Sequence, residues 1–391
     1  MTGTDRVVVV GASLAGLRAA EALRGAGYEG RVQIVGDEPH LPYNRPPLSK
    51  KALHGRESMT ELPFHIADSL DADWHLGSAA VGLDTAAKVV ALASGERLDY
   101  DRVLIATGVR ARWPDVFTAG RRVTAVRTLD DARRLSEALD TARRVLVVGA
   151  GFIGCEIAAS VRPRGIEVAL VDLAPSPLVG PIGEVPARLL AERHVAEGVS
   201  MHLGAGVAKV LGTPDAPLGV ELTNGETVDG DVIVVGIGSA PNVEWLSGSG
   251  VTVDNGVVCD ATLRADGVDD VWAAGDVVNW PHPRLDGART RVEHWTHAAM
   301  SGMAAGRNMI ADGAARDFDV LPEFWSDQYD LNIRGFGLTG GRYDFELVHG
   351  DTSGPWVGVY RDGDRVVGAL SLNATRQLAR WRREILPVSV A

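Results

Sequence analysis

Cysteine, lysine and long apolar runs are scarce in this chain of 391 residues. The two cysteines, Cys155 and Cys259, lie too far apart in sequence to suggest a disulfide framework, and this favours a reducing cytoplasm. No apolar run reaches the roughly 18 residues that span a bilayer, and no signal-peptide pattern precedes the strand predicted from Arg6. The formal net charge of −12 argues against general binding to nucleic acid or to an anionic membrane. We therefore expect a cytoplasmic protein that binds neither.

Glycine, in contrast, is abundant. The chain has 46 glycines and is 46% hydrophobic, which is typical of a soluble α/β protein whose turns close around buried strands. At this length, two or three domains are expected.

Two glycine-rich turns are the most informative feature of the sequence. Each follows a β-branched run and precedes an alanine-rich stretch with helical character. In such a strand–turn–helix unit, small residues let the backbone approach a dinucleotide pyrophosphate, and the N–H groups at the helix N-terminus bind its charge. Two such turns predict two dinucleotides, and hence electron transfer between a flavin and a nicotinamide. The predicted contacts are Gly11, Ser13, Ala15 and Gly16 in the first turn, and Gly149, Gly151, Ile153 and Gly154 in the second.

Carboxylates follow each turn at the spacing that a ribose requires. Ser13 replaces the middle glycine of the first turn, which is tolerable if its φ stays negative, so a plain strand–helix connection is the alternative there. Asp37 lies where an acid that accepts both ribose hydroxyls is expected, although an ordinary loop acid would look the same. Asp172 closes the corresponding strand of the second unit, and no arginine follows it to hold a 2′-phosphate. This pattern predicts NADH over NADPH.

Two further sites carry titratable groups of interest. Asp276 follows an apolar strand and an Ala-Ala-Gly turn, so it could bind a ribityl hydroxyl or cap the next segment. Lys50 ends a proline-rich loop, and Glu156 lies two residues after Gly154. Each of these two alone is an ordinary surface charge. As a pair beside a flavin, the cation would favour the anionic reduced ring and a buried carboxylate would keep that cation fixed.

The predicted elements form two similar βαβ units followed by a segment of different character. From about Phe318, aromatic residues, glycines and alternating residues predict antiparallel strands at 356–360 and 365–370. The proline-rich loop should not be helical until its end. The predicted strands elsewhere are 7–10, 32–35, 102–106, 145–148, 168–172, 231–235 and 271–276, the last ending in Gly-Asp. The predicted helices are 14–24, 153–161 and 293–310.

Rarer sequence strings indicate a family. Pro-Pro-Leu-Ser-Lys occurs at 46–50 and Trp-Ser-Asp-Gln-Tyr at 325–329. With these and further strings in order along nearly the whole chain, the sequence resembles the FAD-dependent ferredoxin reductases of bacterial oxygenase systems. It departs from them in Ser13 and in a slightly short C-terminal region. The further matching strings lie at 35–38, 105–108, 127–132, 148–156, 236–238, 275–276 and 291–295.

The resemblance implies an α/β fold with two Rossmann-like nucleotide-binding domains, glutathione-reductase-like, plus a small α+β C-terminal domain. The FAD-binding domain would comprise residues 1–110 and 236–317, the NAD-binding domain 111–235, and the C-terminal domain 318–391. The implied FAD contacts are Gly11, Ser13, Ala15, Gly16, Asp37, Arg45, Lys50, the backbone near Ala80, Arg127, Gly275, Asp276, Trp295 and Trp325. The implied NAD contacts are Gly149, Gly151, Ile153, Gly154, Glu156, Asp172 and Gly238.

The same resemblance implies that NADH delivers a hydride to the flavin N5, and that single electrons then pass to a [2Fe–2S] ferredoxin that supplies a cytochrome P450 or a Rieske oxygenase. Lys50 and Glu156 would tune the flavin and orient the nicotinamide. No metal site and no general base are expected. Relatives with a Cys-x₄-Cys, a Cys-x-x-Cys or a single flavin-side cysteine are excluded, because residues 39–50 contain none and Cys155 follows a glycine turn as a packing residue.

Several alternatives stay open at this point. The acceptor could be a rubredoxin, a small organic acceptor or oxygen, and the protein could be a nucleotide-binding sensor, although its charge opposes DNA binding. The C-terminal domain could carry a homodimer interface. Ferredoxins are commonly acidic, so docking would need a basic patch. The candidates are Arg289 and Arg291, and in the tail Arg376, Arg380, Arg382 and Arg383, for which a solvated helix face is the alternative.

Overall fold

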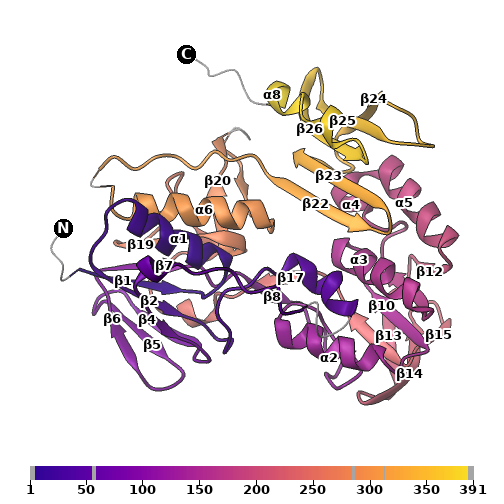
Figure 1. The fold of residues 1–391 in the computed structure, drawn as a ribbon, viewed down its shortest axis with the longest axis horizontal. Helices are drawn as coiled ribbons and strands as arrows, with labels where there is room; N and C mark the ends of the chain where they lie inside the picture. Colours follow the sequence, from indigo (N-terminus) through magenta and orange to yellow (C-terminus); the bar gives the residue numbers. More distant parts are fainter. Residues whose placement is uncertain (1–4, 55–58, 284–286, 312, 386–391) are drawn as a thin grey trace. The chain divides into compact units, whose positions relative to one another are not determined.

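The chain folds into two compact units, which are described separately (Figure 1). The computed structural model describes residues 5–54, 59–283, 287–311 and 313–385. Each unit is discontinuous in sequence. Unit 1 comprises Met1–Asn44, Pro63–Arg110 and Ala240–Pro322, and unit 2 comprises Arg45–Leu62, Ala111–Ser239 and Glu323–Ala391.

Unit 1 is built on a five-stranded parallel sheet of order β19-β7-β1-β2-β3. The apolar residues of its central strands are at most 2% exposed, as expected for a parallel sheet covered on both faces. The strands are β1 (Arg6–Val10), β2 (Arg31–Val35), β3 (Ala72–His75), β7 (Arg102–Ile105) and β19 (Val271–Ala273).

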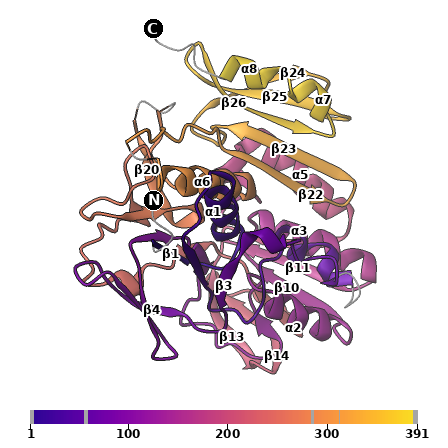
Figure 2. The same ribbon diagram turned by 60° about the vertical axis from the view of Figure 1, so that its left-hand side comes forward.

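Two helices of unit 1 pack closely because small residues line their contact. Helices α1 (Leu14–Gly25) and α6 (Trp295–Asn308) lie side by side in both views (Figures 1 and 2). A Cβ atom at Gly302 or Gly306 of α6 would collide with the backbone of Ala15 or Ala19 of α1. This contact fixes the N-terminus of α1, where the first glycine turn ends.

Two smaller sheets and short helical turns complete unit 1. One sheet is antiparallel, with β4 (Ala80–Asp84), β5 (Val89–Leu92) and β6 (Arg97–Asp99). The other has order β18-β20-β21, with β18 (Val257–Val258), β20 (Val278–Pro281) and β21 (Arg289–Thr290). The short turns are η4 (Asp68–Leu70), η6 (Glu244–Leu246) and η7 (Gly275–Val277). The chain passes between the units at β8 (Val109–Ala111) and β17 (Ser239–Pro241).

Unit 2 contains the second five-stranded parallel sheet, of order β12-β11-β10-β16-β9. Helix α2 (Leu129–Leu139) begins at a capping box in which Thr128 and Asp131 satisfy each other's backbone N–H groups. The strands are β9 (Val123–Thr124), β10 (Arg144–Val148), β11 (Glu167–Asp172), β12 (Val199–Leu203) and β16 (Val232–Val235), with β13 (Val207–Thr213), β14 (Ala216–Leu222) and β15 (Thr227–Asp229) in an antiparallel sheet. The other helices are η1 (Pro46–Ser49), η2 (Lys51–His54), α3 (Phe152–Val161), η5 (Arg162–Arg164), α4 (Val179–Ile182) and α5 (Glu184–Ala196).

The C-terminal part of unit 2 is an antiparallel sheet of order β22-β23-β26-β25-β24. It packs on α3 through Phe324 and Phe152, whose ring centroids lie 5.0 Å apart, and Tyr360 donates a hydrogen bond of 2.7 Å to the carbonyl of Ile182. The elements are β22 (Glu323–Gln328), β23 (Leu331–Gly337), β24 (Asp344–His349), β25 (Trp356–Asp362), β26 (Arg365–Leu372), α7 (Thr375–Leu378) and α8 (Trp381–Ile385).

The predicted α/β fold class is confirmed, and the predicted strands and helices form with shifted ends. The helix predicted at 293–310 runs only from Trp295 to Asn308, and helix α5 was not foreseen. The proline-rich loop becomes helical at Pro46, where proline is favoured in a first turn. Within the described part of the chain, no helix has the length and apolarity needed to cross a membrane.

Candidate functional site

The first glycine turn has the geometry that a dinucleotide cradle requires. Gly11 has φ +131°, and a Cβ there would collide with the carbonyl of Ala106, so only glycine fits. A Cβ at Gly16 would collide with the carbonyl of Gly11, so the helix can close on the turn only without it. Ser13 has φ −126° and is the N-cap residue of α1, although its side chain makes no capping hydrogen bond. The serine therefore occupies the turn without strain.

The Gly275-Asp276 segment lies against this same turn. Gly275 has φ +81°. A Cβ atom added to Gly275 would lie 3.0 Å from the Cβ of Ala15, so the two segments are in close contact. Its N–H donates to the hydroxyl of Ser301 at 2.9 Å. Asp276 lies within η7, whose N-cap is Ala274.

Other predicted FAD contacts in unit 1 are more dispersed. Asp37 is exposed just beyond β2, and one of its carboxylate oxygens accepts from the N–H of Glu38 at 3.0 Å. Trp295 begins α6, and its indole N–H donates to the side chain of Asn44 at 3.0 Å. Ala80 begins β4, in a different sheet from β1.

The second glycine turn repeats the first and adds an open position. Gly149 has φ +106°, and a Cβ there would collide with the carbonyl of Gly236, while a Cβ at Gly154 would collide with Gly149. Gly151, the N-cap of α3, meets no protein atom within 4 Å of an added Cβ. Packing therefore explains Gly149 and Gly154. Gly151 instead leaves open space at the N-terminus of α3, where backbone N–H groups can bind an anion. Ile153 beside it is 43% exposed.

Asp172 is held against this turn. Its Oδ2 accepts from the N–H of Ala150 at 2.5 Å, and its Oδ1 accepts from the N–H of Ala174 at 2.7 Å. Leu173, the next side chain, is 74% exposed. Gly238 has φ +100° and follows β16. The carboxylate thus lies beside the cradle, and its role as a ribose ligand stays a prediction.

Lys50 and Glu156 form an ion pair inside unit 2. The Nζ of Lys50 lies 2.8 Å from the Oε1 of Glu156, and the two side chains are 18% and 6% exposed. This burial excludes the surface-charge alternative. The guanidinium of Arg45 donates to the carbonyl of Arg127 at 2.8 Å, so these two predicted contacts also meet. Trp325 lies under the guanidinium of Arg334, and the Cζ atom of Arg334 is 5.8 Å from the centroid of the Trp325 ring.

Sequence reasoning missed several polar side chains around Glu156. The hydroxyl of Ser49 donates to its Oε2 at 2.5 Å, and the hydroxyl of Ser326 donates to its Oε1 at 2.7 Å. Ser326 is followed by Gln328 on the same face of β22, and both are fully buried. The alternation of residues along β22 places Ser326 and Gln328 on its buried face. Two polar residues at buried positions of one strand could have indicated a polar site from sequence.

Neither cysteine is suited to redox chemistry. Cys155 and Cys259 are both free and fully buried, in different units. Burial raises the pKa of both thiols, so neither forms the thiolate that exchange requires. Among the described residues, no group of three or more His, Cys, Asp or Glu could hold a metal ion.

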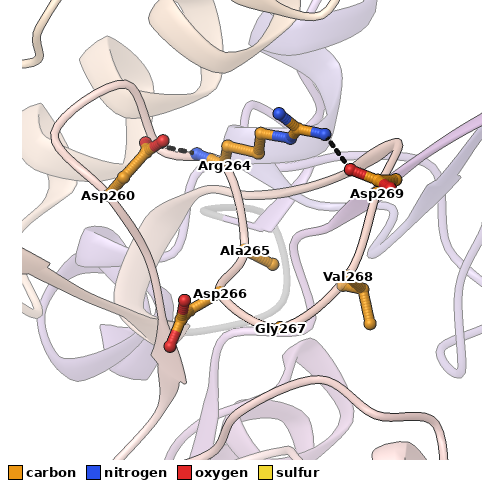
Figure 3. A pocket seen from close by; sticks show the side chains of 7 residues that line it. All are labelled: Asp260, Arg264, Ala265, Asp266, Gly267, Val268 and Asp269. Carbon is orange, nitrogen blue, oxygen red and sulfur yellow. Dashed lines mark hydrogen bonds and ion pairs between the residues drawn. The ribbon is translucent and has the colours of Figure 1, made fainter.

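An open hollow of about 330 Å³ lies in unit 1, apart from every predicted site residue (Figure 3). It is lined by the loop at 260–269, where the guanidinium of Arg264 pairs with Asp269 and the Arg264 N–H donates to Asp260 at 3.1 Å. None of the predicted site residues lines this hollow, so it is not part of the candidate site.

Comparison with known proteins places these features in context. Residues 5–302 match the family model for pyridine nucleotide-disulphide oxidoreductases, and residues 323–386 match the reductase C-terminal model. Rhodocoxin reductase of Rhodococcus erythropolis is 33% identical, covering 95% of this chain and 87% of its own. The ferredoxin–NAD(+) reductase component of the anthranilate 1,2-dioxygenase system of Burkholderia cepacia is 36% identical, covering 97% and 94%.

Among solved structures, the covalent putidaredoxin reductase–putidaredoxin complex matches with a TM-score of 0.91 and 29% identity, covering 98% of this chain and 93% of that one. These similarities confirm the family resemblance and the glutathione-reductase-like fold class expected from the sequence.

Proposed function

Because the chain belongs to the pyridine nucleotide-disulphide oxidoreductase family, we propose that it is an FAD-containing, NADH-dependent ferredoxin reductase. Its acceptor is a [2Fe–2S] ferredoxin that supplies a cytochrome P450 or a Rieske oxygenase. One observation carries this proposal: two dinucleotide cradles are built in one chain whose two thiols are both buried and inert. Electrons must then leave without a cysteine relay, as a one-electron partner allows.

We assign FAD to the unit 1 cradle and the segments around it. Gly11, Ser13, Ala15 and Gly16 would face the pyrophosphate, Asp37 the ribose, and Asp276 the ribityl chain. In this assignment the FAD-binding domain comprises 1–110 and 236–317, the NAD-binding domain 111–235, and the C-terminal domain 318–391. The family resemblance implies further FAD contacts at Ala80, Gly275 and Trp295 of unit 1, and at Arg45, Lys50, Arg127 and Trp325, which belong to unit 2.

NADH is assigned to the cradle of unit 2. The open position at Gly151 admits the pyrophosphate, and Asp172 accepts the ribose hydroxyls. A carboxylate followed by the exposed Leu173, with no arginine at 173–175, disfavours the 2′-phosphate of NADPH. The remaining contacts are Gly149, Ile153, Gly154, Glu156 and Gly238. We expect NADH to give the higher kcat/KM, and an equal or higher value for NADPH would contradict this assignment.

FAD, when bound, accepts a hydride from NADH and can release the two electrons singly. Lys50 would place its ammonium beside the ring, where it stabilises added negative charge. Glu156 holds that ammonium in place at 2.8 Å, and it is in turn fixed by Ser49 and Ser326. No side chain has to take up a proton for the hydride to transfer.

The docking surface for an acidic ferredoxin is proposed in the C-terminal tail. Arg291 is a poor candidate because its side chain is 12% exposed and paired with Glu293 at 2.6 Å, and Arg289 donates to the carbonyl of Cys259. The four tail arginines are all exposed, although Arg382 also pairs with Glu323 at 3.3 Å. They are Arg376, Arg380, Arg382 and Arg383.

The test is steady-state reduction of cytochrome c by NADH, with and without an added [2Fe–2S] ferredoxin. We expect the ferredoxin to raise the rate, and added salt to weaken its effect. Equal stimulation by a rubredoxin, or fast turnover with a small quinone alone, would favour the alternative acceptors. Charge reversal at Arg380 and Arg383 that leaves the ferredoxin KM unchanged would place docking elsewhere. Whether the protein is a homodimer is a separate question for sedimentation analysis.

A further inference from the structure

A continuous chain of polar side chains leads away from Glu156 through the interior of unit 2. We call it the relay, and it comprises Glu156, Ser326, Gln328, His194 and Tyr329. Ser326 contacts Glu156 at 2.7 Å, Gln328 contacts Ser326 at 3.1 Å, His194 contacts Gln328 at 3.0 Å, and Tyr329 contacts His194 at 2.9 Å. The first four residues are at most 5% exposed. A buried polar network destabilises the fold unless every donor and acceptor in it has a hydrogen-bond partner.

Hydrogen-bond chemistry fixes the direction of the first half of the relay. Glu156 is paired with Lys50, so its ionised carboxylate can only accept, and Ser326 must donate its single proton to it. The Ser326 oxygen must then accept from the amide Nε2 of Gln328. This orients the amide, and its Oε1 is the atom that faces His194.

The protonation of His194 fixes the hydrogen-bond directions in the second half of the relay, from Gln328 to Tyr329. Because the amide Oε1 of Gln328 can only accept, Nε2 of His194 must carry a proton. Burial lowers the pKa of His194 below its usual 6.5, so the ring is neutral and Nδ1 has no proton. Nδ1 therefore accepts from the hydroxyl of Tyr329. Every donor in the relay points toward the Glu156 carboxylate.

The far end of the relay is held firmly. Tyr329 has φ +55°, a left-handed conformation that is costly for an aromatic residue and persists only under strong local constraint. Its ring meets that of His194 edge-on at 5.2 Å and lies beneath the guanidinium of Arg193 at 5.1 Å. Arg193 is itself paired with Asp330 at 2.5 Å and with Glu197 at 2.7 Å.

We propose that Ser326, Gln328 and His194 are positioning residues for hydride transfer, which act by holding the carboxylate of Glu156, and through it the ammonium of Lys50, in one orientation. This inference rests on the proposed function. Oε1 of Glu156 is shared between Lys50 and Ser326, so a carboxylate that turns away from Ser326 also releases Lys50. The relay thus links the buried face of β22 and helix α5 to the candidate catalytic pair.

One test measures the tautomer of His194 directly and needs no catalytic assay. The holoprotein is labelled with 15N-histidine, and the His194 signals are assigned by their absence in His194→Gln. At pH 7 we expect the neutral tautomer with the proton on Nε2 and a hydrogen-bond-accepting Nδ1. A proton on Nδ1 alone, or a ring protonated on both nitrogens, would overturn the proposed direction.

A second test measures whether the relay residues affect the rate of hydride transfer. Single-turnover flavin reduction by NADH is measured for Gln328→Leu, His194→Phe and His194→Gln, with His202→Phe as a matched control. His202 also lies in unit 2, but it pairs with Glu226 outside the relay. Losing one neutral hydrogen bond from the relay should slow hydride transfer about fivefold, with the Kd for NADH unchanged. His194→Gln keeps a donor toward Gln328 and should recover the wild-type rate.

Wild-type rates in Gln328→Leu and His194→Phe would overturn the positioning role. So would a slow His194→Phe that His194→Gln fails to rescue, because that pattern indicates a packing defect. If NADH does not reduce the wild-type flavin at all, the proposed function fails, whereas the tautomer of His194 still reports on the relay by itself.

Discussion

Replacing Lys50 by alanine tests whether the Lys50–Glu156 ion pair contributes more to stability and rate than an exposed ion pair does. The substitution leaves the carboxylate of Glu156, whose side chain is 6% exposed, with the hydroxyl donors of Ser49 and Ser326. Removing one partner of a buried pair costs roughly 3–5 kcal/mol, and the two remaining donors place the expected loss near the lower end, about 3 kcal/mol. For a unit of this size, that corresponds to a fall of roughly 6–12 °C in the midpoint of its thermal transition.

Lys88 provides the matched control. Its Nζ lies 2.7 Å from Asp270, but the two side chains are 44% and 38% exposed. Such a pair is worth at most about 1 kcal/mol, so Lys88→Ala should shift its transition only slightly. Calorimetry measures the midpoints, and stopped-flow absorbance measures flavin reduction by NADH. We expect Lys50→Ala to stay folded and to reduce its flavin at least tenfold more slowly, since a tenfold loss needs only about 1.4 kcal/mol of barrier.

A buried, functional ion pair is excluded if Lys50→Ala melts at the wild-type temperature and gives stopped-flow traces that superimpose on those of the wild type. The same holds if Lys88→Ala loses as much rate as Lys50→Ala. In either case the ion pair would have no special role.

Three further predictions follow from the site and the core. Gly151→Ser keeps a good N-cap residue, so thermal stability should be retained while the added side chain weakens NADH binding about tenfold by calorimetric titration. The double variant Cys155→Ala, Cys259→Ala should reduce ferredoxin at the wild-type rate, and a large loss would reveal a thiol relay. Burial lowers the pKa of His297 to about 3 from 6.5, so only the unfolded state is protonated at pH 5. The free energy of unfolding should therefore fall as the pH drops below 6.5, by about 2 kcal/mol at pH 5, and His297→Phe should flatten this slope in urea titrations.

The two cradles could be predicted from sequence because their constraints are local. Gly11 and Gly149 have a positive φ, and a Cβ at either position would collide with the carbonyl of the residue that follows a neighbouring strand. These requirements act over a few residues of a strand–turn–helix unit, so composition and spacing reveal them. Asp172 was equally visible, because it ends the next strand of the same unit.

The surroundings of Glu156 could not be predicted in the same way. Gln328 and Ser326 come from a strand far along the chain, and His194 comes from a helix that was not foreseen. Their partners are set by how the C-terminal sheet packs on α3, which no local pattern encodes. Arg291 shows the opposite error. As a sequence position it is a candidate docking charge, but its burial against Glu293 appears only in three dimensions.

The most direct test of the account is an anaerobic titration of the purified holoprotein with NADH, followed by visible absorbance, and then addition of an oxidised [2Fe–2S] ferredoxin. We expect the flavin band to bleach with one equivalent of NADH, a long-wavelength charge-transfer band to appear, and the ferredoxin to reoxidise the flavin. A colourless protein, or a yellow protein whose spectrum NADH does not change, would contradict the central claim.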